Sequence, residues 1–222
     1  PPPRARKSVK ARRARIESPA MRANEDLILR TPLVQLVPYR EEHVPRYHEW
    51  MADAHLRAAT ASERLTLHQE LDMCREWARD SRQCTFIVRD ASTSTMIGDC
   101  NFFFNDVDDD DACEIEIMIA ERGARRRGAA REALEVFMAY GAVELGTTTF
   151  TAKIGYENVA SNALFRGLGY EEKSRSDVFE ETTYELRARD DAGNAKARFR
   201  ATWARVERDS YDAFEARRRA GP

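Results

Sequence analysis

The stretch that decides the fold is CEIEIMIAERGARRRGAAREALEVFMAY, residues 113–140. Its first eight residues, 113–120, are rich in β-branched and apolar side chains and predict a strand. From Ala129 to about residue 145 the apolar residues recur at helical spacing and predict a long helix. A strand that leads through a short turn into a helix leaves unpaired N–H groups at the positive end of the helix dipole. Such a junction is suited to binding phosphate.

The turn itself strengthens this interpretation. It reads RRRGAA over residues 125–130. Gly128 lets the backbone approach a ligand closely, and small residues after it leave the helix start unobstructed. Arginines beside the positive end of a helix are unfavourable unless an anion neutralises them, so we favour a pyrophosphate ligand over a solvated basic loop. Neither G-x-x-x-x-G-K-S/T nor G-x-G-x-x-G is present, which excludes the two common nucleotide loops.

The surrounding chain alternates short β-type runs with helical patterns, which is typical of a mixed α/β domain. Three consecutive strands, at 85–90, 96–105 and 113–120, predict an antiparallel meander. The helix after the turn crosses over to a strand at 150–154, which should therefore lie parallel to 113–120. Further strands are expected at 33–37, near Tyr170 and at 178–186, and further helices at 41–51, 67–80 and 158–167.

The helix at 67–80 has the clearest start signal. Thr66 is a plausible N-cap, and Gln69 stands three residues later, as in a capping box. Its apolar stripe, which we expect to be core, consists of Leu67, Leu71, Cys74 and either Trp77 or Ala78.

Composition divides the 222 residues into three parts. Residues 1–20 carry a net charge of +6, against −2 for the whole chain, and have almost no apolar residues, so we expect a disordered basic extension without a role in the fold. Contact of this extension with nucleic acid, an acidic protein or an import receptor is the weaker alternative. Residues 21–187 form the predicted domain. Residues 188–222 space Phe199, Trp203, Val206 and Phe214 roughly helically and predict one amphipathic helix that packs on the domain, dimerises or binds a partner.

The cysteines and the apolar runs exclude several classes of protein. Cys74, Cys84, Cys100 and Cys113 lie ten or more residues apart, which favours neither a zinc site nor a disulfide framework, and the four histidines show no metal spacing. No run approaches the roughly 20 apolar residues of a membrane span, and no signal peptide is evident. We expect a protein without a metal, in the cytoplasm or alternatively the nucleus.

Two motifs in order resemble the GNAT superfamily of acetyltransferases. The R-R-R-G-x-A of the turn is similar to that family's phosphate motif, R/Q-x-x-G-x-G/A. Residues 158–170, NVASNALFRGLGY, are similar to its downstream motif N-x-x-S/A-x-x-L/F-Y/F-x-x-x-G-F/Y. The resemblance extends over about Met21 to Leu186. It is closest to the N-acetyltransferase 9-like branch, near the ribosomal-protein alanine acetyltransferases.

The resemblance implies the GNAT fold, with a twisted, mostly antiparallel sheet that splays open between its fourth and fifth strands to hold acetyl-CoA. The pantetheine arm would bind the backbone at Met118, Ile119 and Ala120, near Asn158 and Ser161. The pyrophosphate would bind the turn made by Arg125, Arg126, Arg127, Gly128, Ala129 and Ala130.

Acetyl transfer needs a base for the amine, and two carboxylates are candidates. Glu114 and Glu116 share one face of the predicted strand, and two close carboxylates raise the pKa of one of them. By resemblance we favour Glu114, because many family members place their catalytic glutamate there. The alternative is that one or both face solvent or pair with an arginine.

The general acid is less evident, because Phe165 replaces the tyrosine frequent in the second motif. Ser161, Tyr156 and water are the alternatives, with Ser161 favoured by resemblance, although a serine at a helix start also serves as a cap.

The resemblance implies transfer of acetyl from acetyl-CoA to a primary amine, most consistently a protein N-terminal α-amino group. It raises tubulin or microtubules as a partner, and does not favour nucleic acid or membrane. The alternative is a catalytically weak or inactive GNAT-fold protein that binds such a partner without turnover.

Overall fold

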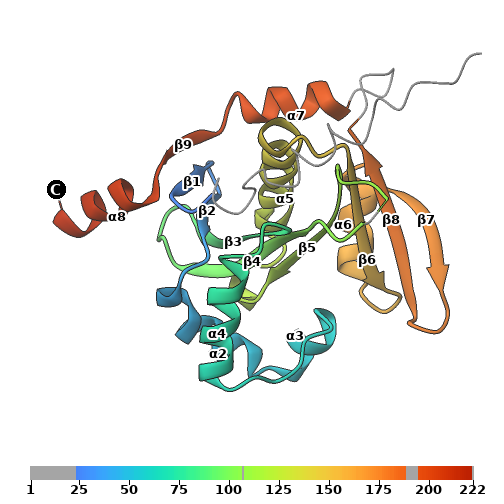
Figure 1. The fold of residues 1–222 in the computed structure, drawn as a ribbon, viewed down its shortest axis with the longest axis horizontal. Helices are drawn as coiled ribbons and strands as arrows, with labels where there is room; N and C mark the ends of the chain where they lie inside the picture. The colour runs from blue at the N-terminus through green and yellow to red at the C-terminus, as the bar shows by residue number, and fades with distance from the viewer. Residues whose placement is uncertain (1–23, 107, 189–194, 222) are drawn as a thin grey trace, which may run out of the picture.

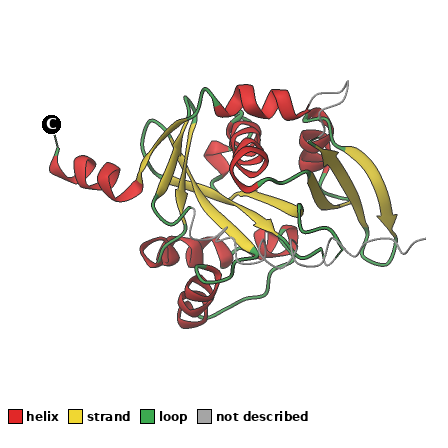
Figure 2. Ribbon diagram, turned by 45° about the horizontal axis from the view of Figure 1, so that its top comes forward, coloured by secondary structure: helices red, strands yellow, loops and turns green. Residues whose placement is uncertain are grey.

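The protein forms one large sheet with helices on both faces (Figures 1 and 2). The computed structural model describes residues 24–106, 108–188 and 195–221. In this part of the chain the strand order is β7-β8-β6-β5-β4-β3-β2-β1-β9, and every neighbouring pair is antiparallel except β5 and β6. The predicted mixed α/β fold with a mostly antiparallel sheet is confirmed.

The strands are β1 (Leu27–Arg30), β2 (Val34–Pro38), β3 (Gln83–Asp90), β4 (Met96–Phe103), β5 (Ala112–Ile119), β6 (Thr149–Gly155), β7 (Glu171–Ser176), β8 (Glu181–Arg187) and β9 (Glu207–Ser210). The α-helices are α2 (Val44–Met51), α3 (Ala54–Ala59), α4 (Leu67–Trp77), α5 (Ala129–Tyr140), α6 (Val159–Gly167), α7 (Ala195–Trp203) and α8 (Tyr211–Ala220). Single helical turns of other types lie at Glu41–His43, Arg122–Ala124 and Gly141–Leu145.

The centre of the sheet follows the prediction closely. β3, β4 and β5 form the expected antiparallel meander, and α5 carries the chain over to β6, which pairs with β5 in parallel. β1 and α3 were not anticipated, because four and six residues give too little periodicity to recognise.

One face of the sheet packs on α5 through aromatic side chains. Phe102 of β4 stacks on Phe137 of α5 with ring centroids 3.6 Å apart, and Phe86 of β3 meets Phe137 edge-on at 5.8 Å. All three side chains are completely buried. Because side chains alternate along a strand, the residues next to Phe86 in β3 and next to Phe102 in β4 point to the opposite face.

The opposite face is covered by α2 and α4. The capping box is confirmed, since Thr66 accepts from the Gln69 amide while the Gln69 side chain accepts from the Thr66 amide. Cys74 is buried, as predicted for the core stripe. Leu67 is not buried, since 42% of it is exposed at the first residue of α4.

The prediction of one amphipathic helix after residue 188 was wrong. The described part of this segment is helix, strand and helix, since α7 ends at Trp203 and β9 adds to the edge of the sheet beside β1. The edge of β1 offers unpaired backbone groups, and pairing with them outweighs the weak helical periodicity of residues 207–210. Phe199 and Trp203 were correctly assigned to one face, which packs on β6 and α5. The basic extension, residues 1–20, lies outside the described residues.

A buried ion pair fixes α8 to the domain. The Arg89 Nη1 atom of β3 donates to Glu215 Oε1 of α8 at 2.6 Å, and both residues are almost fully buried. Arg89 also donates to the Tyr211 hydroxyl at 2.9 Å, which in turn donates to Glu42 at 2.7 Å.

Replacing Glu215 by Gln should destabilise the protein, because Arg89 loses its buried counter-charge. We expect the free energy of unfolding, measured by urea denaturation, to fall by about 2 kcal/mol. Glu207 is the matched control, since its pair with Arg30, at 3.3 Å, leaves the glutamate side chain 71% exposed. Glu207→Gln should cost less than about 0.5 kcal/mol. Equal losses in the two variants would contradict a special role for the buried pair.

Candidate functional site

The site lies where β5 and β6 separate. The two strands are paired only at Ala112–Glu114 against Thr149–Thr151, although β5 continues to Ile119 and β6 to Gly155. The predicted opening between the fourth and fifth strands is therefore present. These strands are β5 and β6 here, because the unpredicted β1 adds one to the numbering. Residues 115–119 of β5 have no strand partner on this side, so an extended ligand can pair with them as a strand would.

The N-terminus of α5 lies beyond the end of β5 and has the geometry of an anion site. Gly128 is the N-cap, with φ 90° and ψ −11°, and no side chain caps the helix. Arg126 also has a positive φ, 61°, so two residues of the turn have left-handed backbone conformations. The first amides of α5, at Ala129, Ala130 and Arg131, have no acceptor within the helix. These N–H groups and the helix dipole fit a phosphate.

The three arginines of the turn divide into two kinds. Arg125 is tied to the end of β5, donating to the carbonyl oxygens of Ile119 at 2.8 Å and Ala120 at 3.1 Å. It therefore holds the turn against the strand. Arg126 and Arg127 are exposed, and neither has an ion-pair partner among the described residues. Their charges are available to a phosphate ligand.

Glu114 and Glu116 share one face of β5, as predicted, and this is the face opposite to α5, but their surroundings differ. The Lys153 ammonium of β6 forms an ion pair with Glu114 at 2.7 Å, across the point where the strands separate. Glu116 has no such partner in the described chain. It is exposed on one side, yet protein surrounds the rest of its carboxyl. Burial, followed by the charges of Glu114 and Asp99, raises the pKa of Glu116 to about 7, and Lys153 opposes this rise.

This arrangement changes the order of preference between the two carboxylates. A general base works best when its pKa is near the operating pH, and it must be free to accept a proton. Glu116 meets both conditions, whereas Glu114 is held by Lys153. Lys153 was not anticipated, since a single lysine in a strand carries no signal until β6 is placed beside β5.

Asn158 and Ser161 lie at the start of α6, which follows the end of β6 after a short turn. Asn158 is the N-cap, and its Oδ1 atom accepts from the Ser161 amide at 3.1 Å. The cap is therefore Asn158 rather than Ser161, which leaves the half-buried Ser161 hydroxyl available to a ligand. Phe165, one turn further on, is buried against Tyr170, with ring centroids 4.9 Å apart. It packs in the core and has no proton to give.

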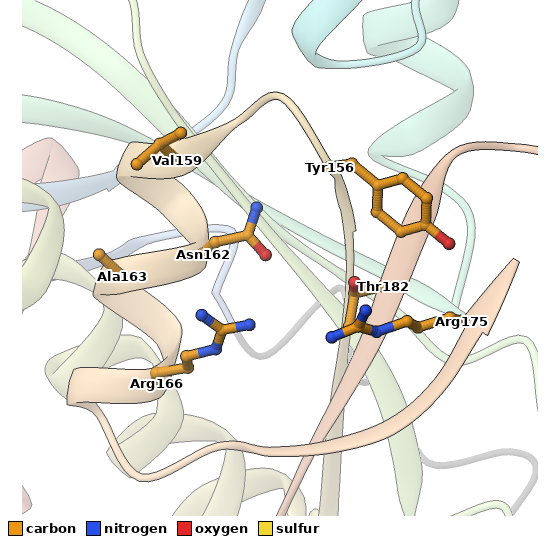
Figure 3. A pocket seen from close by; sticks show the side chains of 7 residues that line it. All are labelled: Tyr156, Val159, Asn162, Ala163, Arg166, Arg175 and Thr182. Atoms are coloured by element: carbon orange, nitrogen blue, oxygen red, sulfur yellow. The ribbon is translucent and has the colours of Figure 1, made fainter. Parts of the chain in front are cut away.

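Tyr156, the other candidate acid, belongs to a separate hollow of about 330 Å³ between α6 and the β7–β8 hairpin (Figure 3). Its hydroxyl donates to Asp177 of the hairpin at 3.1 Å. Arg166 of α6 and Arg175 of β7 extend into the same hollow (Figure 3). This hollow is not the predicted cofactor site, because it lies on a different face of α6 from Ser161 and Phe165. The residues that line it are Tyr156, Val159, Asn162, Ala163, Arg166, Arg175 and Thr182.

Two features are absent from the part of the chain that the structure describes. No group of three His, Cys, Asp or Glu side chains is placed to hold a metal ion. No helix there is long and apolar enough to cross a membrane.

Comparison with known proteins gives the family. Residues 34–171 match the acetyltransferase (GNAT) domain, a range that contains the strand opening, the α5 turn and α6. The chain is 48% identical over 157 residues to an N-acetyltransferase 9-like protein from Nematostella vectensis, covering 67% of this chain and 79% of that protein. It is 45% identical over 159 residues to the human alpha/beta-tubulin-N-acetyltransferase 9, covering 67% and 77%.

Solved structures agree on the fold. Mycobacterium smegmatis RimJ in complex with CoA-disulfide has a TM-score of 0.65 at 20% identity, covering 82% of this chain and 97% of that one. Spermidine N-acetyltransferase from Vibrio cholerae, in complex with CoA and spermine, has a TM-score of 0.64 at 15% identity, covering 71% and 96%. At these identities the likeness concerns the fold alone. With the domain match and the close relatives, it follows that the chain belongs to the GNAT family of acetyltransferases.

Proposed function

We propose that this acetyltransferase modifies protein N-terminal α-amino groups, that tubulin is among its acceptors, and that Glu116 is the base. The observation that carries the proposal is the free Glu116 carboxyl at the opening between β5 and β6, on the sheet face covered by α2. The acetyl-CoA pyrophosphate would bind the α5 turn, and its pantetheine arm would follow the unpaired edge of β5.

The choice of an α-amine rests on proton affinity. An α-amino group has a pKa of about 8 and a lysine side chain about 10.4, so the α-amine is far more often neutral near pH 7. A base whose pKa is about 7 is matched to deprotonating an α-ammonium rather than a lysine. Relatives at 45–48% identity from human and mouse are named alpha/beta-tubulin-N-acetyltransferase 9, which supports tubulin as an acceptor.

In the proposed reaction the nitrogen of the α-ammonium loses two protons, and the thiolate of CoA gains one. Glu116 accepts one proton from the α-ammonium, the neutral amine nitrogen attacks the thioester carbonyl, and the carbon–sulfur bond breaks while the second proton of the nitrogen replaces the one that Ser161 or water gives to the thiolate. The departing thiolate takes a proton from Ser161 or from water, because Phe165 supplies none. The net result is an N-acetyl group and the free thiol of CoA.

The test is acetylation of a peptide pair, followed by mass spectrometry. Both peptides contain an internal lysine, and one of them has its N-terminus blocked. We expect acetylation of the free N-terminus only, and of the tubulin N-terminus when the heterodimer is offered. Acetylation of lysine in both peptides would contradict the proposal. Tubulin binding without turnover would favour the alternative of a binding protein, which the absence of a tyrosine at position 165 supports. The cytoplasm, where tubulin lies, is the compartment we propose.

A further inference from the structure

Asp99 of β4 is a buried carboxylate without a cationic partner. It is only 2% exposed, and in the described chain no Lys, Arg or His forms an ion pair with it. Two neutral side chains donate hydrogen bonds to it: the Asn101 amide, which donates to Asp99 Oδ2 at 2.9 Å, and the Tyr47 hydroxyl of α2. A carboxylate buried in this way is costly, so its surroundings must favour keeping it.

The surrounding hydrogen bonds all run toward Asp99. Gln83 Nε2 donates to the Thr85 hydroxyl at 3.3 Å, and this hydroxyl donates to Asn101 Oδ1 at 2.6 Å. Asn101 then donates to Asp99. The chain of donors crosses β3 and β4 and ends on the carboxylate, so it fixes the position of Asp99. Burial raises the pKa of Asp99 to about 6, and the hydrogen bonds from Asn101 and Tyr47 oppose this rise and favour the charged form.

This row of hydrogen bonds lies next to Glu116. Asn101 is directly opposite Glu116 in the β4–β5 register, and Asp99 is opposite Met118. Side chains directly opposite have Cβ atoms about 5 Å apart, and diagonal neighbours about 7 Å. Asp99 is therefore a diagonal neighbour of Glu116 on the same face of the sheet.

The other charged and titratable groups around Glu116 come from three elements. They are Glu114 on β5, Lys153 on β6 and Tyr47 on α2. Lys153 pairs with Glu114 at 2.7 Å, so the lysine does not neutralise Asp99. The charge of the buried Asp99 therefore acts on the partly exposed Glu116 without a nearby counter-ion.

We propose that Asp99 is a positioning residue for acetyl transfer: anchored by Asn101 and Tyr47, its charge sets the pH range over which Glu116 can accept the proton of the amine. This rests on the proposed role of Glu116 as base. Removing the charge would make Glu116 a weaker base that loses its proton at lower pH.

The test is Asp99→Asn in the full chain, which keeps the shape and removes the charge. Two readouts are compared with the unaltered protein: the pH profile of kcat/KM for a peptide acceptor, and the ¹³C NMR titration of Glu116. The Glu116 signal is identified by its loss in Glu116→Gln. We expect both midpoints to fall by about half a pH unit. Glu207→Gln removes a carboxylate that is 71% exposed on β9, at the far edge of the sheet, and should leave both midpoints in place.

The NMR titration separates this inference from the proposed function. If the unaltered protein acetylates no peptide but the Glu116 midpoint still shifts in Asp99→Asn, the coupling holds and the proposed function fails. A slower variant with both midpoints unmoved would overturn the inference and leave Asp99 a structural residue. If Asp99→Asn does not fold, Tyr47→Phe takes its place. It removes a hydrogen bond that favours the Asp99 anion and should shift both midpoints in the same direction by a smaller amount, and unmoved midpoints there would equally overturn the inference.

Discussion

Replacing Glu116 by Gln is expected to lower kcat by about 10²- to 10³-fold, the range typical of losing a general base. The amide has nearly the shape of the carboxyl but does not accept the proton of the amine. Because a base must be unprotonated to act, kcat/KM of the unaltered enzyme should rise as pH increases through about 7, the pKa of Glu116. In Glu116→Gln that rise should disappear, while the affinity for acetyl-CoA, measured by calorimetry, stays unchanged.

Glu114→Gln is the matched control for this prediction. Glu114 is two residues away on the same face of β5 and is held by Lys153, so its loss should lower kcat by less than about tenfold. If Glu114→Gln were instead the more damaging variant, Glu114 would be the base, as the family resemblance favoured.

Replacing Gly128 by Glu should abolish the binding of acetyl-CoA. The residue at this position has φ 90°, which strains any side chain, and a Cβ atom there would lie 3.4 Å from Leu33 Cδ1. The added carboxylate would also stand at the helix N-terminus, where the pyrophosphate is expected. Titration calorimetry with acetyl-CoA should show no measurable binding by the variant.

Gly123→Glu serves as its control, because it introduces the same charge five residues earlier. A Cβ atom at Gly123 meets no atom within 4 Å. This variant should keep most of its affinity for acetyl-CoA. Loss of binding in both variants would mean that charge near the turn, rather than the geometry of Gly128, decides binding.

The central part of the fold and the place of the Gly128 turn could be predicted from the sequence because their signals are local. β5 alternates apolar and acidic residues, β3 and β4 are short runs bounded by turn residues, and the Gly128 turn lies between a strand and a helix. The capping box of Thr66 and Gln69 is equally local.

The contacts that could not be predicted from the sequence depend on strands being placed side by side. Lys153 and Glu114 are 39 residues apart and meet only because β6 pairs with β5. Asp99 gains its significance from its register against β5 and from burial under α2. The strand β9 forms because the edge of β1 is available to it, although its own residues are mostly charged or polar.

The pairing of β1 with β9 has a consequence for synthesis. Leu27 lies opposite Ser210, so β1 is synthesised early but gains its edge partner only when residues 207–210 have been synthesised. A nascent chain in which residues 207–210 have not yet left the ribosome would have the α5 turn and the β5–β6 opening already outside, but the edge at β1 would remain unpaired. Such an edge invites pairing with other chains. The domain should therefore be most exposed to aggregation before residues 207–210 are available to pair with β1, and factors that shield nascent chains would matter most until then.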